Sequence, residues 1–384
     1  MFKVKAINLY EALERVAVGG GECYVIAVDP TPMKIGENQT VQVASISTSD
    51  GEKTGITSIQ IHCIDMDKPE IYYATANIKA AVSSLSKITD MLIVESKGSH
   101  LLVSDEKKES VIKVELKEQD KLLELPGTPE GAVLVTMKRE NFVNSIRLGG
   151  YSAVESNRAG TENINFLVDV KNKRLVTMSM RNSSMCKAEA SIEDAKSMAE
   201  KENEWHLINY KFIQSMIKKL SGDLIQIAFT PKFMMVVTKD TRYGCKKSEG
   251  MQPVSYMKVF ENKESLYSGT IDKKDLMLGM EIAMVGVTDN NILLEGNDNG
   301  TLNVLSKSSG NKSSVLQKKY EGKMPQKMVY FDILKQVLGG IGDEVHYYGV
   351  VTKDGGNTKE FVRFDGIDSG VQYESILLPI SYKK

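Results

Sequence analysis

The side chains that most often catalyse reactions or bind metals are few and scattered in this chain. Acid–base catalysis and metal binding both need several such groups close together. The four histidines are far apart in predicted strands or at their edges, and we expect structural roles for them: His62, His100, His206 and His346. The four cysteines form no CxxC pair, which is typical of a reduced cytosolic protein with free thiols: Cys23, Cys63, Cys186 and Cys245.

Two glycine-rich stretches have the composition of ligand-binding loops but not their spacing. The GGG at 19–21 precedes a strand-like run rather than a helix opening with GK[ST], so it is not a phosphate-binding loop. The GNDNG at 296–300 lacks the spacing and the terminal glutamate of a calcium loop. We therefore expect no catalytic residue, no metal site, no cofactor and no enzyme activity.

Two other groups of side chains suit binding rather than catalysis. The first is ILLPI (376–380) near the C-terminus, which is either a core edge strand interrupted by proline or part of a docking surface. The second is a set of lysines and arginines on predicted helices. These helices carry a charge of about +5 and the rest of the chain about −6, which favours a basic face although the whole chain has −1. Charges on helices are also often only solvated.

The predicted elements that position these side chains recur along the chain. Helices that follow a strand are expected to begin near 8, 138 and 272, and a second set, each followed by two strands, near 76, 209 and 330. Both sets repeat at about 130 residues, the last interval being shorter. Asn8, Thr136 and Asp272 are candidate N-caps. Two markers with one period predict three copies of one domain.

Hairpin signals between alternating runs indicate antiparallel strands, at 171–174, 297–300 and 353–356. The sequence thus predicts an α+β fold of three repeated domains, each with two helices packed on antiparallel sheets, with bounds 1–128, 129–263 and 264–384. The polar stretch 191–204 is interpreted as an excursion within the second copy. No apolar run of 18 residues and no signal peptide is seen, so we expect a cytoplasmic protein that does not bind a membrane.

The order and spacing of five segments are similar to those of the bacterial DNA sliding clamp, the beta subunit of DNA polymerase III. They are FKVKAINLYEALERV (2–16), NFLVDVKNKRLVTMSM (165–180), QPVSYMKVF (252–260), KKYEGKMPQKMVYFDILKQVL (318–338) and YESILLPI (373–380). The resemblance covers the whole chain and identifies it as a divergent member. It implies half of a ring in each chain, and a homodimeric ring that encircles duplex DNA and binds a DNA polymerase and a clamp loader through short hydrophobic peptide motifs.

The resemblance also implies where these partners bind. Non-specific DNA contacts would come from Lys79, Lys138, Arg139, Arg147, Lys211, Lys218, Lys219 and Lys273. The partner-peptide pocket, between the second and third domains, would be formed by Met178, Met180, Pro253, Tyr256, Lys258, Val259, Tyr330, Leu377, Leu378, Pro379 and Ile380. The dimer interface would join Ile112 and Val114 of one subunit to Val285 and Val287 of the other, unless these four fill their own domain cores.

One stretch departs from the family. Where the family has threonine, aspartate, glycine, histidine and arginine on a pocket strand, this chain has MSMRN (178–182). The two methionines either make the pocket more apolar and adaptable or only pack. A changed pocket would fit a different partner peptide, as in a clamp of a phage or mobile element. Two alternatives stay open: a clamp-fold scaffold or regulator that does not encircle DNA, and an unrecognised hydrolase.

Overall fold

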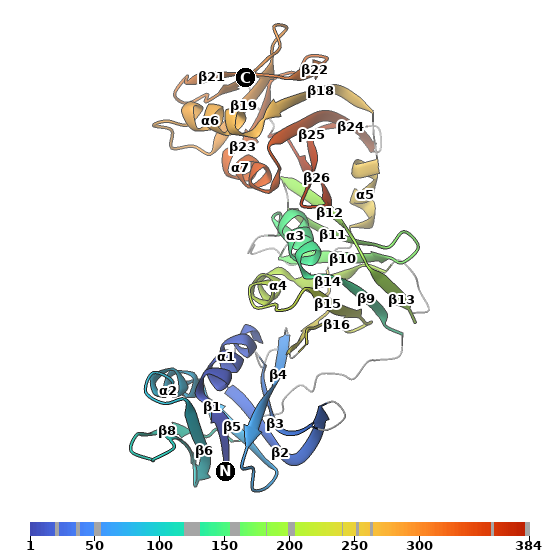
Figure 1. The fold of residues 1–384 in the computed structure, drawn as a ribbon. Coiled ribbons are helices and arrows are strands. Elements are labelled where there is room, and N and C mark those ends of the chain that lie inside the picture. Colours follow the sequence, from blue (N-terminus) through green and yellow to red (C-terminus); the bar gives the residue numbers. More distant parts are fainter. Residues whose placement is uncertain are drawn as a thin grey trace. The chain divides into compact units, whose positions relative to one another are not determined.

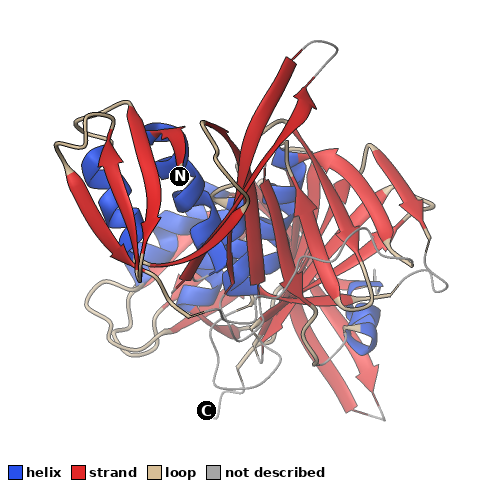
Figure 2. Ribbon diagram, turned by 90° about the horizontal axis from the view of Figure 1, so that it is seen from below, coloured by secondary structure: helices blue, strands red, loops and turns tan. Residues whose placement is uncertain are grey.

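Antiparallel strands make up most of the described chain. The computed structural model describes residues 1–19, 23–35, 39–49, 55–118, 131–153, 162–181, 183–198, 204–239, 241–250, 253–261, 264–354 and 357–380. Within these residues it has seven α-helices and 26 strands (Figure 1), and strands outnumber helices throughout (Figure 2). The strands form one thirteen-stranded, one nine-stranded and one four-stranded sheet.

Six of the helices begin directly after a strand, at the positions expected from the repeat. The first set is β1 (Phe2–Lys5) with α1 (Ala6–Val16), β9 (Val133–Lys138) with α3 (Arg139–Gly150), and β18 (Ser265–Asp272) with α6 (Lys273–Ala283). The second set is β5 (Glu70–Thr75) with α2 (Asn77–Leu85), β14 (His206–Asn209) with α4 (Tyr210–Ile217), and β23 (Lys327–Tyr330) with α7 (Phe331–Gly340). The repeat of helix starts is therefore confirmed.

The predicted N-caps were less accurate than the helices. Asn8 lies inside α1, whose N-cap is Lys5, and Thr136 lies in β9, so both assignments were wrong. Asp272 is at the N-cap of α6 but its side chain caps no backbone amide. Its carboxylate instead contacts Lys318 at 2.6 Å. The starts of these helices are decided by the burial of one helix face. In α1 that face carries Leu9, Leu13 and Val16, which are buried.

The thirteen-stranded sheet runs in the order β13-β9-β15-β16-β17-β4-β1-β6-β7-β8, with β3 joined to β4 and β2 joined to β3 and β5. Its remaining members are β2 (Cys23–Ile35), β3 (Gln39–Ser49), β4 (Gly55–Ile64), β6 (Met91–Lys97), β7 (His100–Asp105), β8 (Val111–Glu115), β13 (Asp194–Ser197), β15 (Leu224–Phe229), β16 (Phe233–Val237) and β17 (Thr241–Lys246). α1, α2 and the strands of the first third enclose one apolar core that includes Phe2, Leu13 and Val82. β13 shows that the polar stretch 191–204 contains a strand.

The nine-stranded sheet has the order β14-β10-β11-β12-β26-β25-β24-β18-β22, and the four-stranded sheet β21-β20-β19-β23. The new members are β10 (Asn163–Asp169), β11 (Arg174–Arg181), β12 (Ser184–Ser191), β19 (Asn291–Gly296), β20 (Thr301–Leu305), β21 (Lys312–Leu316), β22 (Lys319–Glu321), β24 (Glu344–Asp354), β25 (Asn357–Asp368) and β26 (Val371–Leu377). The turns expected at 171–174 and 297–300 join paired strands. β24 and β25 also pair, although 355–356 lie outside the described residues.

One helix was not expected. The segment QPVSYMKVF, interpreted from the sequence as a connector, includes all but the last residue of α5 (Val254–Glu261). It lies on the side of β11, β12 and β26 opposite α3 (Figure 1), since its Val259 and Phe260 pack with Met178 whereas Thr177 of β11 donates a hydrogen bond to the Ser145 carbonyl of α3.

The chain divides by its internal contacts into two compact units. The first unit is Met1–Arg139 with Lys196–Glu200 and Lys211–Lys247, and the second is Glu140–Ala195 with Lys201–Tyr210 and Ser248–Lys384. The expected middle domain, 129–263, contributes to both units. Of its predicted borders, 126–130 lies outside the described residues, so the bounds of three domains stay a prediction.

Candidate functional site

The apolar C-terminal segment is held at two places in the second unit. β26 pairs with β12 on one side and β25 on the other, and it ends at Leu377, which is buried. Beyond it, the Leu378 amide donates to the Ser183 carbonyl at 3.0 Å and the Ile380 amide donates to the Met328 carbonyl at 2.8 Å. The segment therefore passes from the nine-stranded sheet to β23 of the four-stranded sheet.

This path separates the predicted pocket residues of the C-terminus into two kinds. Leu377 is 1% exposed and belongs to the core, whereas Leu378 is 38% exposed and Pro379 and Ile380 are half-buried. Tyr330, at the end of β23, is 37% exposed. Leu378, Pro379 and Ile380 with Tyr330 thus form an accessible apolar surface, and we refer to it as the tail surface.

The two methionines of the divergent stretch belong to a cluster beneath α5. Met178 is fully buried and packs with Val259, Phe260 and Ile376, while Met180 is partly buried at the edge of the cluster. Pro253, before α5, is also buried. Met178 therefore packs in the core, which agrees with the alternative that the methionines only pack. The side chain of Met180 is partly exposed. The side chains of Tyr256 and Lys258 lie outside the described part of α5.

The opposite face of the same strands is polar. Paired positions on adjacent antiparallel strands share a face, and here Arg181 pairs with Ser184, which pairs with Leu377. Arg181 Nε donates to Ser184 Oγ at 2.9 Å, and Ser184 Oγ is 2.8 Å from Ser152 Oγ.

Buried hydroxyl and thiol groups extend this network towards α3. Ser179 Oγ lies 2.9 Å from Cys186 Sγ, and Tyr151 donates a hydrogen bond to Ser375. Burial raises the pKa of the Cys186 thiol, which keeps it uncharged. None of these hydroxyl and thiol groups is a histidine or carboxylate that could act as a general base, so we interpret the network as polar packing.

In the first unit, an acidic residue neutralises two of the lysines expected to contact DNA. Glu14 of α1 lies 2.6 Å from Lys79 of α2 and 3.2 Å from Lys219, which follows α4. The hydrogen bond from Lys79, aided by Lys219, holds the pKa of Glu14 below its ordinary value. These pairs tie the first and middle thirds of the chain together.

The other basic residues of the first unit that were expected to contact DNA differ in their exposure to solvent. Lys138, Lys211 and Lys218 are exposed, and within the described residues Lys138 and Lys218 form no ion pair. The Arg139 side chain is half-buried, and its Nε is covered without a hydrogen-bond acceptor. Of the residues expected to contact DNA in this unit, Lys138, Lys211 and Lys218 are thus the exposed ones.

The basic residues expected in the second unit are engaged. Arg147 of α3 pairs with Asp368 of β25. Lys273 Nζ donates to the Ile341 carbonyl at 2.6 Å, at the end of α7. The exposed face of α6 also carries acidic side chains, among them Asp275 and Glu281. The basic residues expected to contact DNA in this unit are therefore already bonded to other groups of the chain.

Two of the terminal strands of the sheets bear on the predicted dimer interface. β8 ends the order of the thirteen-stranded sheet and β21 ends that of the four-stranded sheet. On β8, Val114 is buried in the first core and Ile112 packs against it, which favours the alternative that these two fill their own core. Their place in a dimer interface stays a prediction. Val111 on the same strand is 47% exposed.

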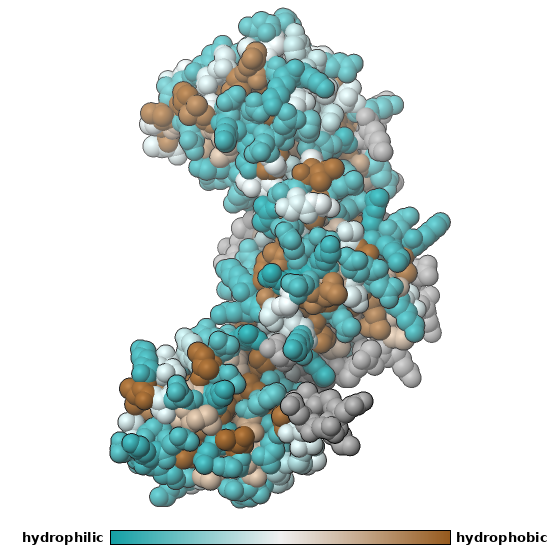
Figure 3. Space-filling model, viewed as in Figure 1, coloured by the Kyte–Doolittle hydropathy of each residue, from teal (hydrophilic) through white to brown (hydrophobic). Residues whose placement is uncertain are grey.

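An exposed apolar patch lies beside β21. It consists of Leu278 and Ile282 of α6 with Val285 just after it, which are 57%, 44% and 67% exposed. Asn311, next to β21, donates to the Val285 carbonyl at 2.8 Å, which fixes the patch against that edge. Figure 3 shows hydrophobic side chains gathered over the end of α6 and next to β21. Val287 is half-buried, and Leu278 and Ile282 were missed by the sequence reasoning.

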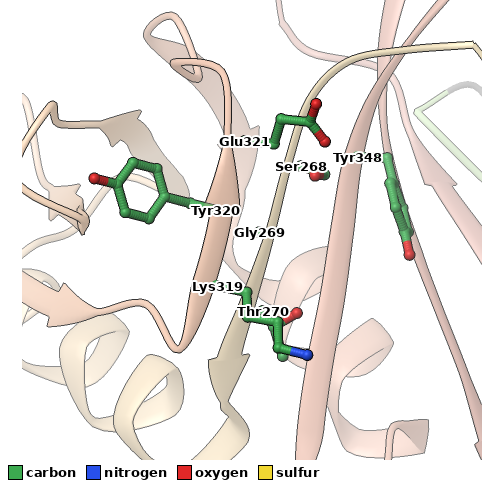
Figure 4. Close-up of a pocket in the computed structure, with 7 residues that line it drawn as sticks. All are labelled: Ser268, Gly269, Thr270, Lys319, Tyr320, Glu321 and Tyr348. Carbon is green, nitrogen blue, oxygen red and sulfur yellow. The ribbon is translucent and has the colours of Figure 1, made fainter.

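A separate hollow of about 260 Å³ lies over β18, β22 and β24, where Ser268, Thr270 and Tyr348 line it with Lys319 and Glu321 (Figure 4). Tyr320 points away from the other labelled side chains (Figure 4). Lys319 and Glu321 carry opposite charges and are both exposed. The hollow contains none of the predicted site residues.

The described residues contain no group of three or more histidine, cysteine, aspartate or glutamate side chains that could hold a metal ion. Among the described helices, none has the length and hydropathy needed to cross a membrane.

Comparison with known proteins shows similarity at the level of the fold. No family model matches the chain, and no curated protein matches it. A DNA polymerase III beta subunit from Thermotoga maritima matches with a TM-score of 0.78 and 13% identity, covering 100% of this chain and 99% of the other. A putative beta subunit from Eubacterium rectale matches with a TM-score of 0.79 and 15% identity, covering 99% and 98%.

The DNA polymerase sliding clamp from Bacillus subtilis matches with a TM-score of 0.78 and 13% identity, covering 100% and 99%. Over its whole length the chain thus has the fold of bacterial DNA polymerase III beta subunits. The expected α+β clamp fold is confirmed.

Proposed function

We propose that this chain is a DNA sliding clamp, a homodimeric ring that encircles duplex DNA and tethers a DNA polymerase and other replication or repair factors. One observation carries the proposal: the chain and the beta-subunit structures cover each other almost completely, at 99–100% of this chain and 98–99% of two of them. The protein would be a non-catalytic processivity subunit that acts in the cytoplasm.

Weak DNA contacts suffice for such a ring. A closed ring stays on DNA because the two are linked, so its bore needs only non-specific phosphate contacts, which typically give a Kd of about 10⁻⁴ to 10⁻⁶ M. Lys138, Lys211 and Lys218 are exposed and suit this role. Lys79, Lys219, Arg147 and Lys273 would add charge near the duplex, although each already contacts an acidic group or a carbonyl.

Ring closure would use the edges of β8 and β21, two of the terminal strands of the sheets. An exposed strand edge favours pairing with another strand, and each chain carries both β8 and β21. Pairing β8 of one subunit with β21 of the other would cover Leu278, Ile282 and Val285 beside β21. Two such head-to-tail contacts related by a two-fold axis close a ring.

Partner proteins would bind at the tail surface, formed by Leu378, Pro379 and Ile380 with Tyr330, and Met180 would add apolar area. Burying two or three apolar anchors gains about 1.5–3 kcal/mol each. Ordering a flexible peptide removes much of this gain. The expected Kd is about micromolar, which suits partners that exchange.

Topological retention tests the proposal. Dimers re-formed from diluted protein in the presence of nicked circular DNA should stay bound at about 0.5 M salt, where phosphate contacts alone are strongly weakened. Cutting the circle with a restriction enzyme should release them. The same plasmid, linearised before assembly, is the control. Equal loss from circular and linear DNA would contradict encirclement.

The pairing of Lys79 and Lys219 with Glu14, and of Arg147 with Asp368, favours the alternative of a clamp-fold scaffold that binds replication proteins without encircling DNA. Such a scaffold would still bind peptides at the tail surface. It would not be retained on the circle, so the same experiment separates the two functions.

A further inference from the structure

Arg181 has a charged group that the protein itself leaves incompletely paired. Its Nε donates to Ser184 Oγ at 2.9 Å, but one terminal amino nitrogen, Nη2, is covered and has no acceptor. A buried donor without an acceptor is costly, and more so when it belongs to a charged group. The guanidinium therefore has an unused donor that an anion would satisfy.

Other arginines of the second unit are neutralised by a carboxylate. Arg174 pairs with Glu189 at 2.8 Å, Arg147 pairs with Asp368, and Arg363 lies 3.4 Å from Asp365. Within the described residues Arg181 has no such ion pair. Among the described residues, the carboxylate of Asp332 at the start of α7 acts on it electrostatically without forming an ion pair.

Arg181 also lies beside the tail surface. Its side chain is on the face of β11 opposite Met180, in a row with Ser184 and Leu377 that crosses three strands. Asp332, whose charge acts on it, lies two residues after Tyr330 of the tail surface. The next residue after that row, Leu378, is bound through its amide to Ser183. A peptide that covers Leu378 would thus bring its flanking residues close to the guanidinium.

We propose that Arg181 binds a carboxylate of the partner peptide, next to the apolar anchors that cover the tail surface. This inference rests on the proposed partner site. A guanidinium matches a carboxylate with two parallel hydrogen bonds, and its partial burial strengthens the pairing. The nearby charge of Asp332 disfavours a doubly charged phosphate, so a single carboxylate is the fitting ligand.

Three synthetic peptides test the inference: acetyl-Gly-Glu-Gly-Leu-Phe-amide, the same peptide with Gln in place of Glu, and the Gln peptide with a free C-terminal carboxylate. By fluorescence anisotropy competition, the full chain should bind the Glu peptide about tenfold to a hundredfold more tightly than the neutral Gln peptide. If the peptide with the free C-terminal carboxylate bound as tightly as the Glu peptide, the carboxylate bound by Arg181 could come from a chain terminus.

Arg181→Gln should reduce the preference for the Glu peptide to less than about threefold and leave binding of the neutral peptide unchanged. Arg181→Lys should keep part of the preference, and matching melting curves would show that both variants fold. If the unmodified chain bound the Glu and Gln peptides equally, the role of Arg181 would be wrong while the partner site stood. Failure to bind any of them at millimolar peptide would contradict the partner site as well.

Discussion

At the scale of single residues, Glu14 joins two lysines that the sequence predicts as DNA contacts. A partly exposed ion pair contributes about 0.2–1 kcal/mol, and Glu14 makes two of them. Glu14→Gln should therefore lower the free energy of unfolding at pH 7 by about 1 kcal/mol. Urea unfolding measures this change. Glu11→Gln, on the same helix with a longer contact of 3.8 Å to Arg15, is the control and should change stability less.

The contribution of Glu14 should also depend on pH. Because the pKa of Glu14 is lowered in the folded chain, its stabilisation is complete above the ordinary carboxyl pKa of 4.5 and is lost as the pH falls below it. The stability difference between the unmodified chain and Glu14→Gln should thus shrink from pH 7 to pH 3.5. A difference that stayed constant over this range would show that the lysines contribute nothing through the carboxylate.

Leu377 and Leu378 are neighbours with opposite roles. Leu377→Ala removes a fully buried side chain and should cost about 2–5 kcal/mol in unfolding free energy. Leu378→Ala together with Ile380→Ala removes exposed and half-buried side chains, so it should abolish peptide binding while dimer assembly and stability change little. Chemical denaturation and peptide titration on both variants separate the two effects. Intact peptide binding by the double variant would count against the tail surface.

The different exposure of Leu377 and Leu378 could not be predicted from the sequence. Leu377 is paired with Ser184 and Val362, whereas the amide of Leu378 is bound to the Ser183 carbonyl, and Ser183 and Ser184 are far away along the chain. The sequence shows an apolar run, but it does not show where the pairing with β12 stops. The ion pairs of Glu14 were missed for the same reason, because Lys219 lies more than 200 residues from it.

At the scale of elements, one glycine sets how closely α3 packs on β11. A Cβ on Gly149 would lie 2.2 Å from Thr177 Oγ1 and 2.7 Å from the Thr177 carbonyl oxygen. Gly149→Ala should therefore lower the free energy of unfolding by about 1–3 kcal/mol, since a strand backbone must move. Gly339, also near the end of a helix, has nothing within 4 Å of its Cβ position. Gly339→Ala should instead stabilise by about 0.5–1 kcal/mol.

Thermal or urea unfolding of the two variants checks this contrast. Similar effects of both substitutions would mean that helix propensity, rather than the approach of α3 to Thr177, decides the outcome.

Local patterns predicted the six repeated helices well and missed the seventh. Alternation in a strand followed at once by a helical spacing is a strong signal, and it recurs six times. α5 has only eight residues, so its short apolar spacing was interpreted as a connector. The position of α5 depends on packing against Met178 of β11 and Met185 of β12.

At the scale of the whole molecule, the repeat in the sequence predicted the fold, whereas the surfaces depended on tertiary structure. The dimer residues expected on β8, Ile112 and Val114, belong to or pack on the core, and the exposed apolar patch includes Leu278 and Ile282 instead. The sequence pattern of a strand or helix shows which side chains share a face. It does not show which edge remains unpaired after all three sheets have formed.

The patch at the end of α6 gives a test of the ring itself. In a head-to-tail homodimer one substitution changes both interfaces, so its effect on assembly is doubled. Val285→Glu places a charge where apolar area would be covered, and burying an unpaired charge is strongly unfavourable. The variant should therefore sediment as a single chain of 42.5 kDa at concentrations where the unmodified protein has twice that mass. Ile367→Glu, with the same 67% exposure elsewhere in the second unit, should stay dimeric. A dimeric Val285→Glu would place the interface elsewhere. An unmodified protein that sedimented as a single chain would contradict a ring closed by β8 and β21.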